Sequence, residues 1–123
     1  MNYKMIIKRI NYIGQDEAIV VISDGEFDII AFAHPFNGKI NDNLSVPLLC
    51  LNSENIVKVN GEKYRVITSN NEFEQYFHGK VIDKDNSIVN IGNIKIELDI
   101  NLPQDIKNGD FITFKCNRLD IIK

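Results

Sequence analysis

The chain has 123 residues, a formal net charge of −3 at pH 7 and a charged fraction of 25%. Its hydrophobic content of 44% is ordinary for a folded protein, which excludes wholesale disorder. Neither half is basic and no apolar run reaches the ~18 residues of a membrane span, so the marks of a duplex-DNA binder and of a membrane-spanning protein are missing. We expect one compact domain over residues 1–123.

Local composition favours strands and a cytoplasmic location. Isoleucine is abundant, and β-branched side chains suit a pleated surface better than a helix. The N-terminal residues lack the apolar stretch and small-residue cleavage site of a secretory signal. Two cysteines cannot supply a disulfide framework. We therefore expect a β-rich protein of the cytoplasm.

The first third of the chain predicts a β-hairpin. Residues 18–22 are a continuous apolar run, typical of a strand buried on both faces, and residues 27–33 return as a second arm. The polar residues 23–26 supply the turn. Pro35 ends the second arm because proline removes a backbone donor, and residues 47–51 resume an apolar strand.

The middle of the chain predicts another hairpin, at Asn60-Gly61. This dipeptide accepts the two positive φ angles of a type I′ turn. Such a turn would place Val57 opposite Tyr64.

A short helix is predicted over residues 69–77. Ser69 can cap it, Glu72 can complete a capping box, and Gly79 would stop it. Together, the second hairpin and the helix would form a connection over residues 56–77.

The second half predicts strands with one solvated face. Residues 94–100 alternate isoleucine or leucine with polar side chains, and residues 112–116 do the same. This strict period of two is the clearest strand signal in the chain.

The two halves also share an order of motifs, at offsets of 67 to 69 residues. The matching pairs are Ile19-Val20 with Ile88-Val89, Gly25 with Gly92, Pro35 with Pro103, and Asn41-Asp42 with Asn108-Gly109. A fixed period of this kind indicates one supersecondary unit used twice, in residues of about 3–60 and 78–122.

Residues 78–122 resemble the antiparallel part of an OB-fold barrel. The resemblance is carried by Gly79-Lys80-Val81-Ile82, by the hairpin through Gly92 and by the polar turn before the alternating strand in residues 107–114. It implies a small β-barrel and an oligonucleotide- or oligosaccharide-binding role, with a degenerate copy of the unit in residues 3–56. The sequence departs from the OB pattern at residues 102–106, which are too short for the helix between the third and fourth strands.

The predicted fold is therefore all-β, mainly antiparallel, with one short helix. Two repeated OB-like half-barrel units would pack on each other, because a unit of about 60 residues is marginal alone. The units would share a single core.

Few residues could carry chemistry. Cys50 and Cys116 occupy nearly equivalent places in the repeat, so we expect both to pack in the core as small hydrophobes. His34 and His78 show neither the Cys-x-x-Cys nor the His-x-x-x-His spacing of a metal site. The sequence contains no catalytic motif, so we expect no enzyme, no cofactor and no metal.

Acidic side chains gather near the tips of the first predicted hairpin. We take five of them as candidate binding residues, since an acidic patch steers association with a basic partner. They are Asp16, Glu17, Asp24, Glu26 and Asp28.

The predicted function is a non-catalytic protein–protein binding module, of the type of an immunity protein that neutralises a toxin. The alternative is an OB-like binder of oligonucleotides or oligosaccharides. An enzyme of unrecognised type and a purely structural subunit also stay open. We expect the partner to be another protein rather than nucleic acid or a membrane, and the oligomeric state is left open.

Overall fold

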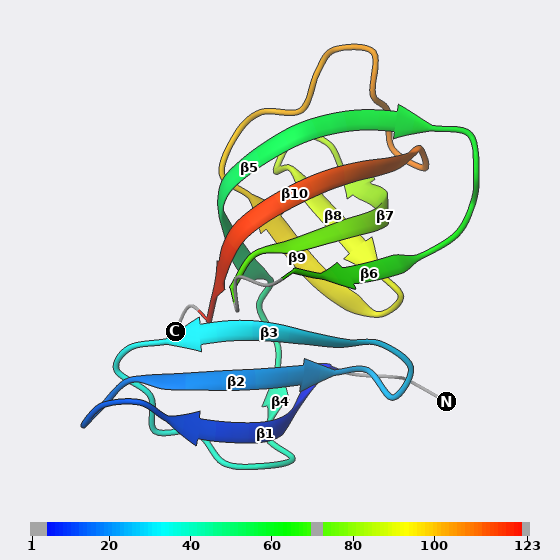
Figure 1. Ribbon diagram of the computed structural model, residues 1–123. Coiled ribbons are helices and arrows are strands. Elements are labelled where there is room, and N and C mark those ends of the chain that lie inside the picture. The colour runs from blue at the N-terminus through cyan, green and yellow to red at the C-terminus, as the bar shows by residue number, and fades with distance from the viewer. Residues whose placement is uncertain (1–4, 70–72, 122–123) are drawn as a thin grey trace.

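The computed structural model describes residues 5–69 and 73–121, and over this range the chain is all-β (Figure 1). No helix long and apolar enough to cross a membrane occurs within these residues. The strands are β1 (Met5–Tyr12), β2 (Ala18–Ser23), β3 (Asp28–Ala33), β4 (Asn43–Leu44), β5 (Leu48–Val59), β6 (Arg65–Thr68), β7 (Gln75–Asp83), β8 (Ile88–Ile91), β9 (Ile94–Leu98) and β10 (Phe111–Asp120).

Five strands close into a barrel in the order β10-β5-β9-β8-β7, with β7 pairing back to β10. All of these pairs are antiparallel except the parallel pair of β5 and β9. Strand β6 extends the sheet from β7. The remaining strands form a smaller sheet, β4-β1-β2-β3, which lies below the barrel in Figure 1 and meets it at a single bridge between Phe32 and Asp120.

The closed barrel is compatible with the predicted OB-like barrel, but its strands do not all come from residues 78–122. The meander β7-β8-β9 and the following β10 come from the second half of the chain, whereas β5 closes the ring from residues 48–59. In an OB-fold barrel the closing strand comes last in the chain. Here β5 precedes the other four barrel strands in the chain, so the barrel sequence begins at a different strand of the ring.

The structure does not confirm two equivalent half-barrels. Strands β1, β2 and β3 form an open sheet, and β5, assigned to the first unit, pairs with strands of the second. What the two halves do share is a glycine with a positive φ angle in a hairpin loop, Gly25 (96°) and Gly92 (62°).

The predicted helix over residues 69–77 is wrong. Gln75, Tyr76 and Phe77 belong to β7, while residues 70–72 lie outside the described residues. Gln75, Phe77, Gly79 and Val81 are buried and the residues between them are more exposed, which is the period of two of a strand. Pairing with both β6 and β10 overrode the local helix signals.

The predicted hairpin at Asn60-Gly61 is also wrong. Val57 lies opposite Thr113 of β10 rather than opposite Tyr64. Tyr64 instead packs against Phe111, with ring centroids 5.3 Å apart. A strand distant in the sequence therefore took the edge of β5 that the hairpin would have used.

Other expectations are confirmed. Strands β2 and β3 form the predicted first hairpin, β3 ends before Pro35, and β9 and β10 alternate buried and more exposed residues. One cluster of buried apolar side chains runs through both the small sheet and the barrel. Its largest fully buried members are Phe77, Phe114, Ile7, Ile22, Ile29, Leu48, Ile91, Ile94, Ile96, Ile106, Ile112 and Leu119.

Hydrogen bonds from side chains link the small sheet to the barrel, and those of Gln75 and Asp24 are the shortest among them. The fully buried Gln75 accepts a hydrogen bond from the backbone N–H of Ile30 and donates one to its carbonyl, each 2.9 Å long. Asp24 accepts a hydrogen bond of 2.8 Å from the backbone N–H of Asn93. Gln75 thus presents to β3 the donor and acceptor that a neighbouring strand would supply.

Replacing Gln75 by leucine should lower the free energy of unfolding by about 2–4 kcal/mol. The change leaves both backbone groups of Ile30 without their partners, and each orphaned buried group costs about 1–3 kcal/mol. Denaturant unfolding measures the effect. Gln15→Leu, at an exposed loop position, is the matched control and should change stability by less than about 0.5 kcal/mol; equal effects at both positions would contradict the role of Gln75.

Gly79→Ala should destabilise the barrel by about 1–3 kcal/mol, because an added methyl group overpacks the core. A Cβ atom at this position would lie 2.5 Å from Cδ1 of Ile91 and 2.7 Å from the carbonyl oxygen of Asn90. Gly61→Ala is the control, since a Cβ there meets nothing within 4 Å. Thermal melts of the two variants should separate clearly, and overlapping melts would show that β8 moves away without cost.

Candidate functional site

The five predicted acidic residues do not form one patch. Asp16 and Glu17 precede β2, while Asp24, Glu26 and Asp28 follow it at the β2–β3 turn. A strand of six residues spans about 20 Å. The two groups of carboxylates therefore lie at opposite ends of the small sheet.

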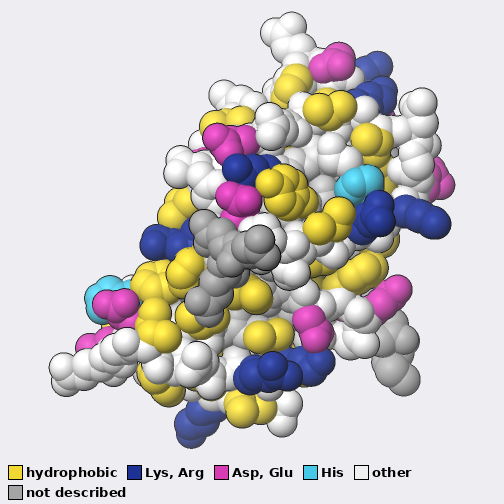
Figure 2. All heavy atoms as spheres, in the orientation of Figure 1, with side chains coloured by type: hydrophobic (Ala, Val, Ile, Leu, Met, Phe, Trp, Pro, Cys, Tyr) yellow, Lys and Arg dark blue, Asp and Glu magenta, His cyan; other side chains and the backbone are white. Residues whose placement is uncertain are grey.

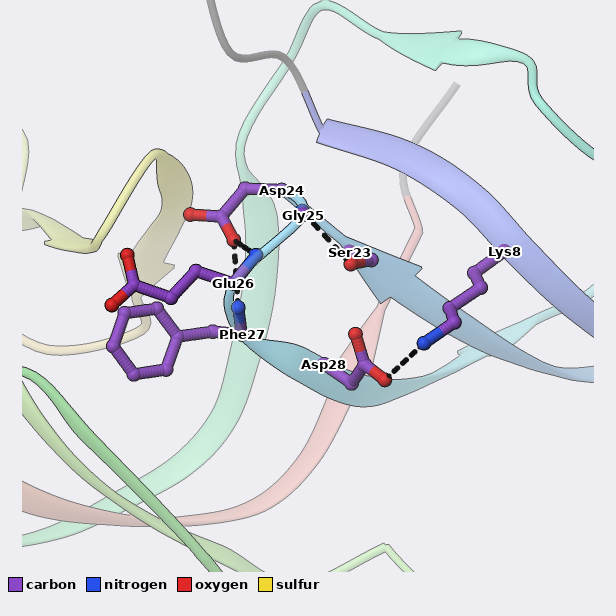
Figure 3. Close-up of polar contacts among 7 residues, drawn as sticks. All are labelled: Lys8, Ser23, Asp24, Gly25, Glu26, Phe27 and Asp28. Atoms are coloured by element: carbon purple, nitrogen blue, oxygen red, sulfur yellow. Dashed lines mark hydrogen bonds and ion pairs between the residues drawn. The ribbon is translucent and has the colours of Figure 1, made fainter.

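At the β2–β3 turn, two of the three acidic side chains form contacts within the protein (Figure 3). Asp24 is buried and accepts hydrogen bonds from the backbone N–H groups of Glu26 (2.9 Å) and Phe27 (2.8 Å). Asp28 pairs with Lys8 at 2.7 Å, and this hydrogen bond holds the pKa of Asp28 below its usual value. Glu26 is exposed and is the acidic side chain of this turn best placed to meet a partner.

At the other end of the sheet, the acidic residues lie beside a histidine. Oε1 of Glu17 is 4.0 Å from Nδ1 of His34, and both side chains are about half exposed. The backbone carbonyl of Asp16 accepts a hydrogen bond from the N–H of Phe36. The side chain of Asp16 is exposed in the loop. This end holds two acidic side chains beside an imidazole rather than an extended acidic surface.

The two thiols are unsuited to nucleophilic chemistry. Cys50 and Cys116 are fully buried, which confirms their expected place in the core. Oγ of Ser53 donates a hydrogen bond to Sγ of Cys50 at 3.2 Å. The hydrogen bond with the Cys50 thiol, together with burial, raises the pKa of Cys116, so the thiol stays protonated and unreactive.

Neither thiol should react with a water-soluble disulfide reagent such as DTNB while the protein is folded. At mildly alkaline pH, where an exposed thiol reacts within minutes, the native protein should give almost no signal and the denatured protein should give two equivalents. Absorbance of the released thionitrobenzoate measures the reaction. Rapid reaction of one native thiol would contradict the buried arrangement.

No group of three or more histidine, cysteine, aspartate or glutamate side chains within the described part of the chain is arranged to hold a metal ion. His78 lies on β7 opposite Thr113 and Arg65, rather than beside a carboxylate or a thiol.

The most distinctive surface is the outer side of β5, β10, β7 and β6, which we call the barrel face. In one row across these strands, Thr113 lies between Val57 and His78. In the next row, Tyr76 lies between Lys115 and Ile67. These six side chains define the barrel face, and the inward residues of the same strands, such as Phe77 and Phe114, are buried.

The barrel face is both apolar and hollowed. Val57 is 54% exposed, Ile67 is 41% exposed and Tyr76 is 37% exposed, which is high for large hydrophobic side chains. A hollow of about 230 Å³ lies among Ile67, Tyr76, Thr113 and their neighbours. Such a hollow can receive a side chain of a partner.

Lys115, at the centre of the barrel face, forms ion pairs with two glutamates. Its Nζ lies 3.4 Å from a carboxylate oxygen of Glu54 and 3.2 Å from one of Glu74. The hydrogen bond with Glu74 raises the pKa of Lys115, burial opposes this and the hydrogen bond with Glu54 adds to it. The centre of the face therefore holds an ion-pair network rather than a free cation.

Free cations lie beside the barrel face instead. Lys63, Arg65 and Lys80 form no ion pair with any described residue. Figure 2 shows basic side chains gathered on the right-hand side of the barrel, next to a histidine. A cleft of about 710 Å³ runs here between the β2–β3 turn and the chain that enters β6, and Lys63, Tyr64, Arg65 and His78 line part of it.

Sequence reasoning missed this surface because it placed residues 69–77 in a helix. In a helix Tyr76 and Phe77 would share a face, whereas in β7 they point to opposite sides. The alternation of residues 75–81 was the available signal, but the rows across the face join residues from four strands. Those pairings cannot be read from one strand alone.

Comparison with family models, with curated proteins and with solved structures finds no match to this chain. The function must therefore be argued from the geometry of the barrel face and its surroundings.

Proposed function

We propose that this protein is a non-catalytic protein-binding module and that the barrel face is its binding surface. The observation that carries the proposal is the exposure of Tyr76 on β7 directly beside the exposed Ile67 on β6, with the exposed Val57 on β5 across β10. Apolar side chains held together on a rigid surface mark sites of interaction. The barrel positions them without help from the partner.

The chemistry of the face supports a protein partner. Aromatic and aliphatic groups at the centre with polar groups around them are the usual anatomy of a protein interface. Here Tyr76 and Ile67 lie beside the hollow, and Lys115 with its two glutamates borders them. A tyrosine next to a pocket is also the type of residue that contributes most to binding energy.

A toxin-neutralising role would use a basic partner and the acidic residues of the first hairpin. Asp24 and Asp28 already make contacts within the protein, and the exposed Asp16 and Glu26 lie at opposite ends of β2. These residues therefore do not form one acidic surface for such a partner.

The second candidate is a single-strand oligonucleotide binder, and one observation favours it. The exposed ring of Tyr76 lies one residue pair away from the free cation Arg65 on the same face, and single-strand binders combine cations with exposed rings. Fluorescence anisotropy with labelled single-stranded DNA at low salt tests this candidate directly. Binding that disappears in Tyr76→Ala would move the assignment to nucleic acid.

Tyr76→Ala should abolish most capture of a protein partner. We expect a loss of affinity of about thirtyfold, since truncation of a central aromatic residue costs about 2 kcal/mol or more. The measurement is an affinity pull-down of the tagged protein from host lysate with nuclease added, followed by titration of the purified partner.

Ile100→Ala is the control for this experiment, because Ile100 is 46% exposed but lies after β9, away from the barrel face. It should bind as the parent protein does. A partner captured equally well by the Tyr76 variant would place the binding surface elsewhere, and capture that depends on nucleic acid would contradict the proposal.

A further inference from the structure

Strand β6 leaves one backbone edge of the sheet unpaired. In the order of strands, β6 and β4 are the two ends, and within the described residues each has a single neighbour. An open edge offers a row of N–H and C=O groups to any extended chain. Of the two, β4 has only two residues, whereas β6 has four.

Strand β6 carries two features that protect an edge, a short length of four residues and the charged Arg65, but it lacks the others. Its sequence, Arg-Val-Ile-Thr, contains no proline and no lysine, and its pairing with β7 is regular from Arg65 to Thr68. Val66 packs against the core and holds the strand in place. The edge is therefore rigid, β-prone and open.

Two exposed side chains of β6 can select which peptide sequence binds along the edge. Arg65 and Ile67 are both exposed and, by their pairing with His78 and Tyr76, lie on the barrel-face side. Two residues of a strand that are two positions apart point the same way. A chain added beside β6 would therefore meet a cation and an apolar group in that spacing.

The charge around this edge favours an acidic occupant. Lys63, Arg65 and Lys80 have no ion-pair partner among the described residues, although the chain as a whole is acidic. Glu26 and Glu62 are the acidic members of the cleft that Arg65 lines. On the other side of Arg65, Glu54 and Glu74 share the single cation of Lys115, so these three groups together keep one negative charge, and Arg65 is the unpaired cation that an acidic residue of a partner would meet.

We infer that β6 binds an extended peptide segment of a partner, which adds to the sheet as a further strand. The segment carries an acidic residue against Arg65 and an apolar residue two positions away against Ile67. Backbone hydrogen bonds to the edge of β6 supply affinity, and the two side chains supply specificity. This inference rests on the proposed function and specifies the chemical class of its partner.

A peptide fits this edge better than a nucleic acid does. Non-specific single-strand binding needs successive rings on which bases stack. Tyr76 is the exposed ring near β6, and its direct neighbour on that strand is the aliphatic Ile67. The unpaired N–H and C=O groups of a strand edge form hydrogen bonds with another peptide backbone, and they do not contribute to base stacking.

The test is a selection from a phage-displayed library of random peptides on the intact protein, followed by titration of the enriched peptides. We expect enriched sequences with an aspartate or glutamate two positions from a valine, isoleucine or leucine, and without proline between them. Arg65→Glu should weaken these peptides by about tenfold or more, because like charges then oppose each other. Lys39→Glu, an exposed charge reversal before β4, is the matched control and should leave binding unchanged.

Hydrogen exchange distinguishes strand addition from binding elsewhere on the barrel face. Bound peptide should slow exchange of β6 amides, and a proline in the centre of the peptide should abolish both binding and protection. Enriched peptides without an acidic residue, or binding without protection of β6, would overturn the inference.

Two further outcomes identify a different occupant. Protection of β6 that rises with protein concentration alone would assign the edge to a second copy of this chain. Displacement of the peptide by single-stranded DNA, with DNA binding lost in Arg65→Glu, would assign it to nucleic acid. Each of these outcomes overturns the inference. A lysate partner that binds the Arg65→Glu variant normally but does not bind the Tyr76→Ala variant would also overturn the inference, but it would leave the proposed function intact.

Discussion

Strand β10 has both of its backbone edges occupied along the same stretch, and the rest of the structure depends on this double pairing. Ile112 lies opposite Lys58 of β5 and Gly79 of β7, and Cys116 lies opposite Ser53 and Gln75. A strand paired on both sides satisfies all of its backbone groups, which is what allows it to run through a core. Strand β10 joins β5 to β7 within the barrel, and its outward residues Thr113 and Lys115 become the middle of the barrel face.

The same strand order explains how the small sheet is held. Strand β3 meets β10 only at its end, so most of its free edge needs another partner. Gln75 supplies one for Ile30 with a side-chain amide, which has the donor and acceptor of a backbone unit. Its neighbour Tyr76 points the opposite way, because successive residues of a strand alternate. One dipeptide thus fixes the two parts of the protein together and presents a ring to the outside.

The sequence predicted those parts of the fold whose signal is local. Alternation in residues 94–98 and 112–116, and the turn between β2 and β3, depend only on neighbouring residues, and these elements were found. The helix over residues 69–77 and the hairpin at Asn60-Gly61 failed because β10 competed for the same backbone. Local propensity is a weak preference that distant pairing overrides.

The candidate site was less predictable than the fold, for a related reason. Acidic residues near a turn can be recognised in a sequence, but Asp24 turned out to be buried and bonded to the backbone of two loops. The barrel face joins residues from Val57 to Lys115 that meet only through strand pairing. Its chemistry, with exposed apolar side chains around a central ion-pair network and cations beside the face, is apparent only once the register is known.

The position of β5 ahead of the meander has a consequence for folding during synthesis. Strands β1, β2 and β3 are joined by short loops and can pair as soon as they leave the ribosome, whereas β5 must wait for β9 and β10, which are made last. Closing a ring between such distant segments carries a large loop-closure entropy and slows folding. Until β9 and β10 are made, β5 is unpaired, and the apolar residues at its start are exposed to aggregation in the nascent chain.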